Sequence, residues 1–197
     1  MGTGTVSITG KGYFTGTAVA EFNIAPMDKG TLVNNGSYQY CITKKGNLQS
    51  GGDMSVVGPL STKIKNVSIP DTVTVGGMKY KITSIEKKAF MNCVKLSKVT
   101  IGANVKTIGS SSFAGDKNLT TVNIKSKALK KIGTKAFYGD RKLKKITLKT
   151  TKLSSIGKQA FKGTKSNATY KLPKSNLKKY KSMIKKAGAG IFSKYKK

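Results

Sequence analysis

Apolar residues recur through the middle of this chain, between Ile82 and Leu177, with a period of 23 or 24 residues. Five positions of the repeat hold a large apolar residue each time. They are Ile85, Ile108, Ile132 and Ile156; Phe90, Phe113, Phe137 and Phe161; Val99, Val122, Ile146 and Tyr170; Ile101, Ile124, Leu148 and Leu172; and Val105, Leu129, Leu153 and Leu177. A single unit of this size cannot bury these positions alone, whereas stacked units share one continuous core. The pattern therefore predicts a solenoid in which each repeat forms one coil.

Within each repeat, the pattern predicts a short strand, a loop and a tight turn. Residues 119–124 and 143–148 alternate, so Val122 and Ile124 face inward and the residues between them face outward. A small residue precedes each phenylalanine, at Ala89, Ser112, Ala136 and Ala160. Two residues after each phenylalanine stands an asparagine or a glycine, at Asn92, Gly115, Gly139 and Gly163. Because these residue types adopt positive φ readily, we expect a turn there.

The repeat residues resemble the BspA-like leucine-rich repeats of bacterial surface proteins, whose pattern is I-G-x-x-A-F-x-G/N-C-x-x-L-x-x-V-x-I-P. The matching segments are ITSIEKKAFMNCVKLSKVTIG, KTIGSSSFAGDKNLTTVNI and KKIGTKAFYGDRKLKKITL, and the match extends over approximately residues 64–180. The cysteine of the pattern is kept only at Cys93, and proline follows the strand only at Pro70 and Pro173. The resemblance implies a mainly β, leucine-rich repeat solenoid that acts as a non-catalytic, cell-surface or secreted binding module. It does not name a ligand.

The chain before the repeats divides into three expected parts. Residues 1–25 read as two strands around a glycine-rich turn, and they resemble the last two strands of the immunoglobulin-like modules of large Gram-positive surface proteins; a plain N-terminal hairpin is the alternative. Residues 26–36 are expected to be a linker, and 37–63 a β-rich N-terminal cap over the open end of the solenoid. The repeats are assigned to 64–172, with a hairpin at Gly76-Gly77 in the longer first unit.

Residues 173–197 are expected to form a C-terminal capping helix and a loose tail. Leu177, Tyr180, Ile184 and Ala187 have helical spacing, Ser175 or Asn176 is a candidate cap, and the helix should end at Gly188. A lysine-rich helix lying on a membrane surface is the alternative. No stretch approaches about 18 apolar residues, so no transmembrane segment is expected. The N-terminus has no signal-peptide pattern, so we interpret the chain as a fragment of a larger, multi-domain extracellular or cell-surface protein.

The residue inventory argues against catalysis. The chain has no histidine, which is the commonest general base and metal ligand. Asp116 and Asp140 are the one candidate carboxylate pair, but we favour the interpretation that each bonds to the backbone of its own turn. Cys41 and Cys93 lie in different predicted elements, so we expect free thiols, although a disulfide would suit a secreted protein. No catalytic residue, metal site or cofactor is therefore predicted.

Charge points to the repeats as the interacting part of the chain. The formal net charge is +31, of which residues 1–79 carry +3 and residues 80–197 carry +28. The outward strand positions and the residues that follow them form the candidate ligand-binding face: Lys98, Thr100, Thr121, Asn123, Lys125, Lys145, Thr147, Lys149 and Lys171. We expect it to bind another protein, of a host or a bacterial surface. The alternative is an anionic polysaccharide or teichoic acid, held electrostatically. This face has no aromatic residue for base stacking and the chain has one arginine, so specific nucleic-acid binding is not expected.

Overall fold

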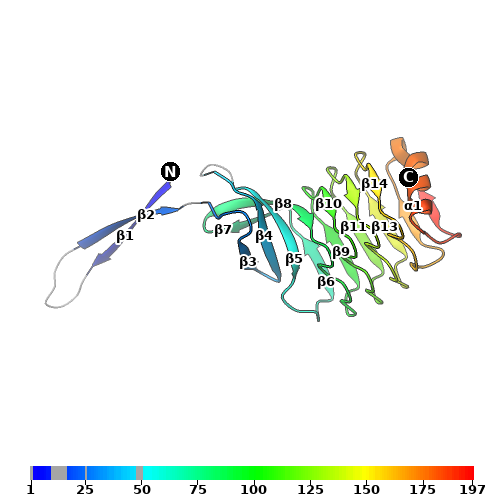
Figure 1. The fold of residues 1–197 in the computed structure, drawn as a ribbon, viewed down its shortest axis with the longest axis horizontal. Coiled ribbons are helices and arrows are strands. Elements are labelled where there is room, and N and C mark those ends of the chain that lie inside the picture. The colour runs from blue at the N-terminus through cyan, green and yellow to red at the C-terminus, as the bar shows by residue number, and fades with distance from the viewer. Residues whose placement is uncertain (1, 10–16, 25, 48–50) are drawn as a thin grey trace.

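The computed structural model describes residues 2–9, 17–24, 26–47 and 51–197, with side chains from residue 26 onward. Most of the chain coils into a β-solenoid of about six turns with one short helix at its C-terminal end (Figure 1). Two sheets run along it, with the hydrophobic core between them. The mainly β solenoid predicted from the sequence is confirmed.

The first of these sheets, the front sheet, is made of six parallel strands in direct register. In spatial order they are β6 (Asn66–Ile69), β9 (Lys98–Ile101), β11 (Thr121–Ile124), β13 (Lys145–Leu148), β15 (Thr169–Lys171) and β16 (Lys194–Lys196). The register places Val67, Val99, Val122, Ile146 and Tyr170 side by side. All five are buried, so every strand turns the same alternate residues inward and leaves the others on the surface.

The back sheet joins the repeats to the N-terminal part of the chain. Its repeat strands are β8 (Met78–Ile85), β10 (Thr107–Ile108), β12 (Lys131–Ile132) and β14 (Ser155–Ile156), all parallel. β5 (Asp53–Pro59), β4 (Tyr38–Lys44) and β3 (Leu32–Asn35) continue it beyond β8, and β7 (Thr72–Val75) forms a hairpin with β8 through Gly76-Gly77. Both glycines have positive φ, as a tight hairpin requires.

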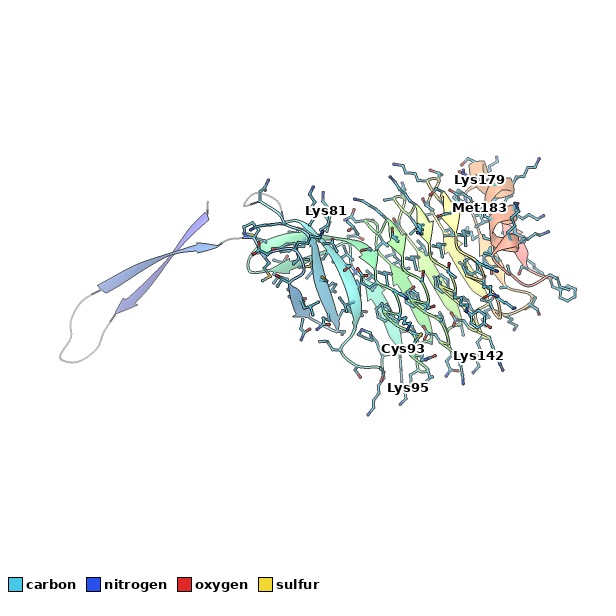
Figure 2. The ribbon with its side chains drawn as sticks, in the orientation of Figure 1. Lys81, Cys93, Lys95, Lys142, Lys179 and Met183 are labelled. Atoms are coloured by element: carbon cyan, nitrogen blue, oxygen red, sulfur yellow. The ribbon has the colours of Figure 1, made fainter. Side chains whose placement is uncertain are left out.

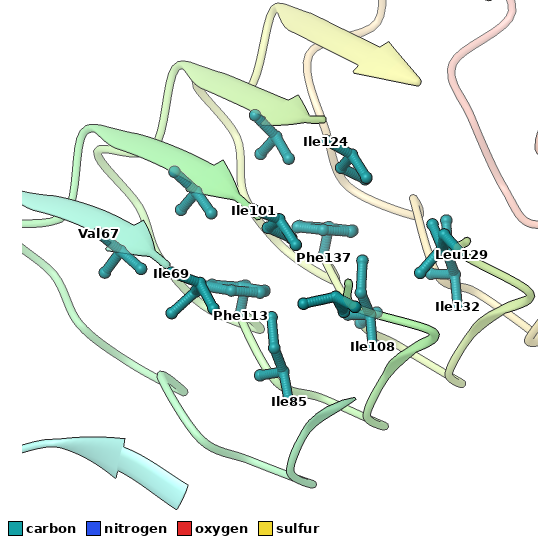
Figure 3. Close-up of a cluster of buried hydrophobic side chains, with 14 of the residues drawn as sticks. Val67, Ile69, Ile85, Ile101, Ile108, Phe113, Ile124, Leu129, Ile132 and Phe137 are labelled. Carbon is teal, nitrogen blue, oxygen red and sulfur yellow. The ribbon is translucent and has the colours of Figure 1, made fainter. Parts of the chain in front are cut away.

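The phenylalanine row is the spine of the core. Phe90, Phe113, Phe137 and Phe161 are fully buried, and their rings stack nearly parallel with centroids 5.1, 5.3 and 5.6 Å apart. Figure 3 shows Phe113 and Phe137 between the inward residues of the front sheet and the row that contains Ile85, Ile108 and Ile132. Tyr38 packs edge-on against Phe90 at one end and Tyr170 against Phe161 at the other.

Two positions of each turn have left-handed backbone geometry, and the sequence predicted one of them. Asn92, Gly115, Gly139 and Gly163 have φ between 61° and 80°, as expected. The second row is Lys88, Ser111, Lys135 and Gln159, with φ between 55° and 60°. Nothing in these residue types signals positive φ. The backbone N–H groups of Lys88, Ser111 and Lys135 donate to carbonyls of the next coil at 2.9–3.0 Å, so the stacking of coils holds the turn in this geometry.

The N-terminal part differs in one respect from the expected linker at 26–36, because β3 lies within it and pairs with β4. Tyr38, Tyr40 and Ile42 of β4 are buried at the N-terminal end of the core, and the backbone N–H of Ser68 on β6 donates to the Tyr38 hydroxyl at 2.9 Å. β1 (Gly2–Thr9) and β2 (Thr17–Ile24) form an antiparallel hairpin, as the sequence predicted, and stand apart from the solenoid (Figure 1). Their resemblance to an immunoglobulin-like module stays a prediction.

The C-terminal helix α1 (Leu177–Lys186) follows a 3₁₀ turn, η1 (Lys174–Asn176), and packs onto the last coil. Tyr180 and Ile184 are buried, and the backbone N–H of Leu153 donates to the Tyr180 hydroxyl at 2.9 Å. Asn176 occupies the N-cap position, but its side chain makes no capping bond. The carbonyl of Ala187 accepts from the N–H of Phe161 at 3.0 Å, where the next coil would do so. The apolar side of α1 therefore packs on the last coil, as a capping helix would.

The expectation of a loose tail is wrong. Lys194–Lys196 form β16, which extends the front sheet, and the Tyr195 ring stacks on Tyr170 with centroids 5.5 Å apart. The N–H of Leu172 donates to the carbonyl of Lys196 at 2.9 Å. The last repeat strand would otherwise expose a row of unpaired backbone groups, and the tail pairs with them. A single apolar residue between lysines is too weak a pattern to predict this strand.

Three successive coils carry a glycine where each rests on the backbone of the preceding coil. A Cβ added at Gly133 would lie 2.5 Å from the backbone nitrogen of Ser110, and Gly109 and Gly157 are equally confined. We therefore expect Gly133→Ala to lower the free energy of unfolding by roughly 1–3 kcal/mol, because the coils must separate to admit a methyl group. Urea unfolding measures this, with the exposed Thr134→Ala as control. A Gly133→Ala variant as stable as the control would show that the coils do not touch there.

Candidate binding face on the front sheet

The outward side chains of the front sheet and of the residues that follow its strands form one surface, the candidate binding face (the binding face below), which contains the nine residues that the sequence proposed. Because the strands are parallel and in register, these side chains fall into rows across the sheet. One row holds Lys98, Thr121, Lys145 and Thr169, and the next holds Thr100, Asn123, Thr147 and Lys171. All are exposed or half-exposed, and neighbours in a row are separated by the strand spacing of about 4.8 Å. The structure thus brings the predicted site residues onto one surface.

A groove of about 640 Å³ lies on this face. Seven of the nine proposed residues line it: Lys98, Thr121, Asn123, Lys145, Thr147, Lys149 and Lys171. Thr100 on β9 and Lys125, which follows β11, do not line the groove. Lys127, Leu148, Leu172 and Pro173 also line it, and the sequence reading did not propose them. The two leucines belong to the inward row, and their side chains are almost wholly buried. Their place in the sequence pattern therefore predicted core residues and not binding residues.

The binding face continues onto β16, which the sequence reading missed. β16 places Lys194 beside Thr169 and Lys196 beside Lys171, so both rows gain a lysine. A second hollow of about 450 Å³ lies there, lined by Lys144, Lys145, Thr169, Lys171, Lys196 and Lys197. The alternation of lysine, tyrosine and lysine at 194–196 was the one sequence feature that could have predicted this strand. Lysine therefore recurs on every second strand of the first row, at Lys98, Lys145 and Lys194.

No acidic residue lines either hollow. Within the part of the chain whose side chains are described, the ion pairs join Lys45 to Asp28 at 2.6 Å and Lys106 to Asp53 at 4.0 Å, and neither involves the binding face. From residue 141 to the end the sequence contains no aspartate or glutamate at all. Lysines also surround the solenoid elsewhere: Lys95 and Lys142 project from its turn edge and Lys179 from α1 (Figure 2). The face is thus one side of a strongly positive surface.

The candidate carboxylate pair is closed to any substrate. Asp116 and Asp140 are fully buried in neighbouring coils. The Oδ1 atom of Asp116 accepts a hydrogen bond from the backbone N–H of Cys93 at 2.8 Å. The Oδ1 atom of Asp140 accepts one from the backbone N–H of Asp116 at 2.9 Å. Each aspartate therefore bonds to the backbone of the preceding coil, and the expectation that it bonds to its own turn is wrong. These side-chain bonds supplement the backbone hydrogen bonds that join one coil to the next. They explain why an aspartate is tolerated at this buried repeat position.

Burial controls the ionisation of this pair. It raises the pKa of Asp116 to about 9, with the nearby Asp140 carboxyl adding to the effect, and raises the pKa of Asp140 to about 8. The second oxygen of each carboxyl is buried and has no hydrogen-bond partner. A charge there would be desolvated without compensation, so both groups are protonated at neutral pH.

The thiols are free, as the sequence predicted. Cys93 is buried and Cys41 half-buried. Burial raises the pKa of the Cys93 thiol to about 11, which keeps it un-ionised. Among the residues that the structure describes, no cluster of three histidine, cysteine or acidic side chains is arranged to hold a metal ion. No helix in the described part of the chain has the length and apolar character to cross a membrane.

Three solved structures of bacterial leucine-rich repeat proteins are similar to this chain. A leucine-rich repeat protein of Bacteroides capillosus is 26% identical, and the match covers 72% of this chain and 98% of that one, with a TM-score of 0.59. A leucine-rich repeat protein of Bacteroides ovatus is 30% identical over 73% of this chain, with the same TM-score. A leucine rich cell surface protein of Faecalibacterium prausnitzii is 25% identical over 75% of this chain, again with a TM-score of 0.59. This chain spans 38% of the length of each of the latter two.

No curated protein matches the chain significantly. The family described as the BspA type leucine rich repeat region matches residues 60–187, in six copies. This range contains the four repeats identified in the sequence and extends from the segment before β6 to the end of α1. It also agrees with the geometry, since the phenylalanine stack and the front-sheet strands β6 to β15 lie inside it. The chain therefore belongs to the BspA type leucine-rich repeat family.

Proposed function

We propose that this chain is a non-enzymatic, adhesin-like binding module of an extracellular or cell-surface protein, and that its binding face recognises another protein. The observation that carries the proposal is the continuous outward face of six parallel strands, with a groove of about 640 Å³ at its centre. Leucine-rich repeats are stacked to display such extended surfaces. The similar leucine rich cell surface protein of F. prausnitzii supports the location.

The composition of the binding face suits a protein partner. Thr121, Asn123 and Thr147 are half-exposed and line the groove, where they supply both hydrogen-bond donors and acceptors. Lys98, Lys145 and Lys171 line it as well and carry charge on long side chains. Neutral hydrogen-bonding groups with charges around them give register and orientation to a protein interface, while lysines accelerate the encounter with an acidic surface. The favoured partner is therefore a protein with an acidic surface patch.

Catalysis has no part in this proposal. The chain has no histidine, and its one carboxylate pair is buried and protonated at neutral pH. General acid–base or nucleophilic catalysis requires such groups to be accessible to a substrate. We accordingly expect no turnover of peptide, ester, glycoside or phosphate substrates.

Electrostatic binding of an anionic wall polymer or a host glycan is the second candidate function. It is favoured by the absence of any acidic residue among the residues that line the two hollows of the binding face. A linear polyanion lying across the strands would meet a lysine of the first row at every second strand, about 9.6 Å apart. Such binding should weaken steeply with salt, because the screening length falls from about 10 Å at 0.1 M to about 3 Å at 1 M.

A comparison of two variants of equal net charge tests the use of the binding face. One replaces four lysines of the face with glutamine, at Lys98, Lys145, Lys149 and Lys171; the other replaces four exposed lysines elsewhere, at Lys87, Lys130, Lys131 and Lys158. The immobilised variants capture proteins from extracts of bacterial and host surfaces, and heparin and teichoic acid are titrated separately. We expect the first variant to lose about tenfold or more in affinity for a protein that the wild type captures, and the second to retain it.

The outcomes separate the hypotheses. Equal loss from both variants would show that only the total charge matters and would overturn the role of the binding face. Binding of the polymers by the wild type, lost in the first variant and abolished by salt, would support the second candidate function instead. Capture of no protein and binding of neither polymer at low salt would contradict both.

A further inference from the structure

The two most exposed large apolar residues in the described part of the chain are neighbours. Ile191 is 88% exposed and Phe192 is 67% exposed. They occupy the turn between α1 and β16, at the C-terminal end of the solenoid, which we call the apolar tip. Burial of a large apolar side chain is favourable, so two such residues held in water are costly unless something covers them.

The structure fixes the apolar tip on both sides. The N–H of Ser193 donates to the carbonyl of Gly190 at 3.0 Å and closes the turn. Gly190 rests against the preceding coil, since a Cβ there would lie 2.5 Å from the Cα of Ser166. The N–H of Lys194 donates to the carbonyl of Ala168 at 2.8 Å, where β16 begins. The fold therefore presents Ile191 and Phe192 on a short anchored turn, in a position where they cannot turn back into the core.

Lysine is the only charged residue type around the apolar tip. Lys185 and Lys186 end α1 just before it, and Lys194, Lys196 and Lys197 follow it, all exposed. On the solenoid end itself, α1 adds Lys178, Lys179 and Lys181, which are exposed as well. The last acidic residue of the sequence is Asp140, which is buried and protonated at neutral pH. The C-terminal end of the solenoid thus exposes two apolar side chains surrounded by positively charged lysines.

We propose that the apolar tip binds the surface of an anionic lipid bilayer, with Ile191 and Phe192 entering the interface and the surrounding lysines meeting the headgroups. Charge complementarity selects this partner, because amphipathic elements with lysine flanks and exposed apolar residues bind anionic membranes through both terms together. Two apolar residues are too few for the core of a stable protein interface, which engages about 20–30 residues a side. They suffice to anchor a surface that charge already attracts.

This inference does not rest on the proposed function, since the binding face contributes none of the apolar residues involved and the two surfaces share only Lys194, Lys196 and Lys197. A module that holds a protein on its front sheet can still lie with its C-terminal end on a bilayer. Loss of the protein partner in the lysine variant of the binding face would not affect the apolar tip, and loss of lipid binding in a tip variant would not affect the binding face.

Vesicle co-sedimentation with the whole chain tests the proposal. The probes are vesicles of phosphatidylcholine alone and of phosphatidylcholine mixed with phosphatidylglycerol. The tip variant carries Ile191→Ser and Phe192→Ser, and the matched control carries Leu32→Ser and Leu60→Ser, which remove two other exposed apolar residues far from the tip. We expect the wild type and the control to bind only the vesicles that contain phosphatidylglycerol. The tip variant should bind these vesicles with an affinity lower by about tenfold or more.

A fluorescent variant measures insertion directly. The chain has no tryptophan, so Phe192→Trp introduces a single reporter at the apolar tip. Its emission should shift to the blue with anionic vesicles, because the ring leaves water. No binding to either vesicle, equal binding by the tip variant, or an unshifted emission from the bound protein would each overturn the proposal; the second result would assign the binding to the lysines alone.

Discussion

Replacing Phe137 with alanine is expected to destabilise the solenoid by roughly 3–5 kcal/mol. The ring is fully buried and lies between Phe113 and Phe161, with centroid separations of 5.3 and 5.6 Å. Its removal opens a cavity in the middle of a core that successive coils share, and the rigid stacking of coils by backbone hydrogen bonds limits how far the neighbours can close it. Urea unfolding followed by circular dichroism measures the loss.

The neighbouring residue supplies a matched control. Tyr138 is 39% exposed and its ring meets the Lys135 ammonium at 5.5 Å, so Tyr138→Ala removes an aromatic ring from the surface of the same coil. Its cost should be below about 1 kcal/mol, the usual worth of an exposed cation–π contact. A loss of under about 1 kcal/mol from Phe137→Ala itself would mean that the phenylalanine row does not form the spine of the core.

Mild acid is expected to stabilise this protein, in contrast to the usual effect of acid on folded chains. The pKa values of Asp116 and Asp140 in the fold, about 9 and about 8, lie far above the ordinary aspartate value of 3.8. Between these limits the folded chain keeps two protons that the unfolded chain has released. The stabilisation is therefore complete below about pH 4 and is lost as the pH rises towards 8 and 9, by at most about 1.4 kcal/mol per pH unit for each carboxyl.

Unfolding in urea at a series of pH values from about 4 to about 8 checks this, with asparagine variants to assign the effect. Asp140→Asn should reduce the slope and the double variant with Asp116→Asn should flatten it, because an amide does not ionise. Glu86→Gln, which changes an exposed carboxyl, should leave the slope unchanged. A wild type that loses stability steadily on acidification over this range would contradict the assignment of two buried, protonated carboxyls.

The sequence predicted the repeats well because their signal is periodic. Rows that recur every 23 or 24 residues can satisfy one geometry only, that of stacked coils with a common inward face. The same alternation that places Val122 and Ile124 inside places Thr121 and Asn123 outside, so the candidate binding face followed from the register. The groove at the centre of this face could not be predicted from the register, because its shape depends on the lengths of side chains from four coils.

What the sequence missed lies where tertiary contacts override local signals. Lys135 takes a positive φ because the next coil binds its N–H, and no local pattern marks that. Asp116 reaches the backbone of another coil 23 residues away, which a reading of single turns cannot find. Lys194–Lys196 form a strand because the last coil leaves a free edge, although their own pattern is weak. Each of these three misses is a contact between coils, and none is a failure of local propensity.

A variant without any change of charge tests the central claim, that the binding face recognises a protein by its shape and hydrogen-bonding groups. Thr121, Asn123 and Thr147 are replaced by alanine, and the exposed Thr134, Ser155 and Ser182 are replaced likewise as the control. Affinity for the captured protein is measured by calorimetry at low and high salt. Our account predicts a moderate dependence on salt, a clear loss of affinity in the face variant and none in the control. Equal affinities for the wild type and the face variant, with binding abolished by salt, would contradict it.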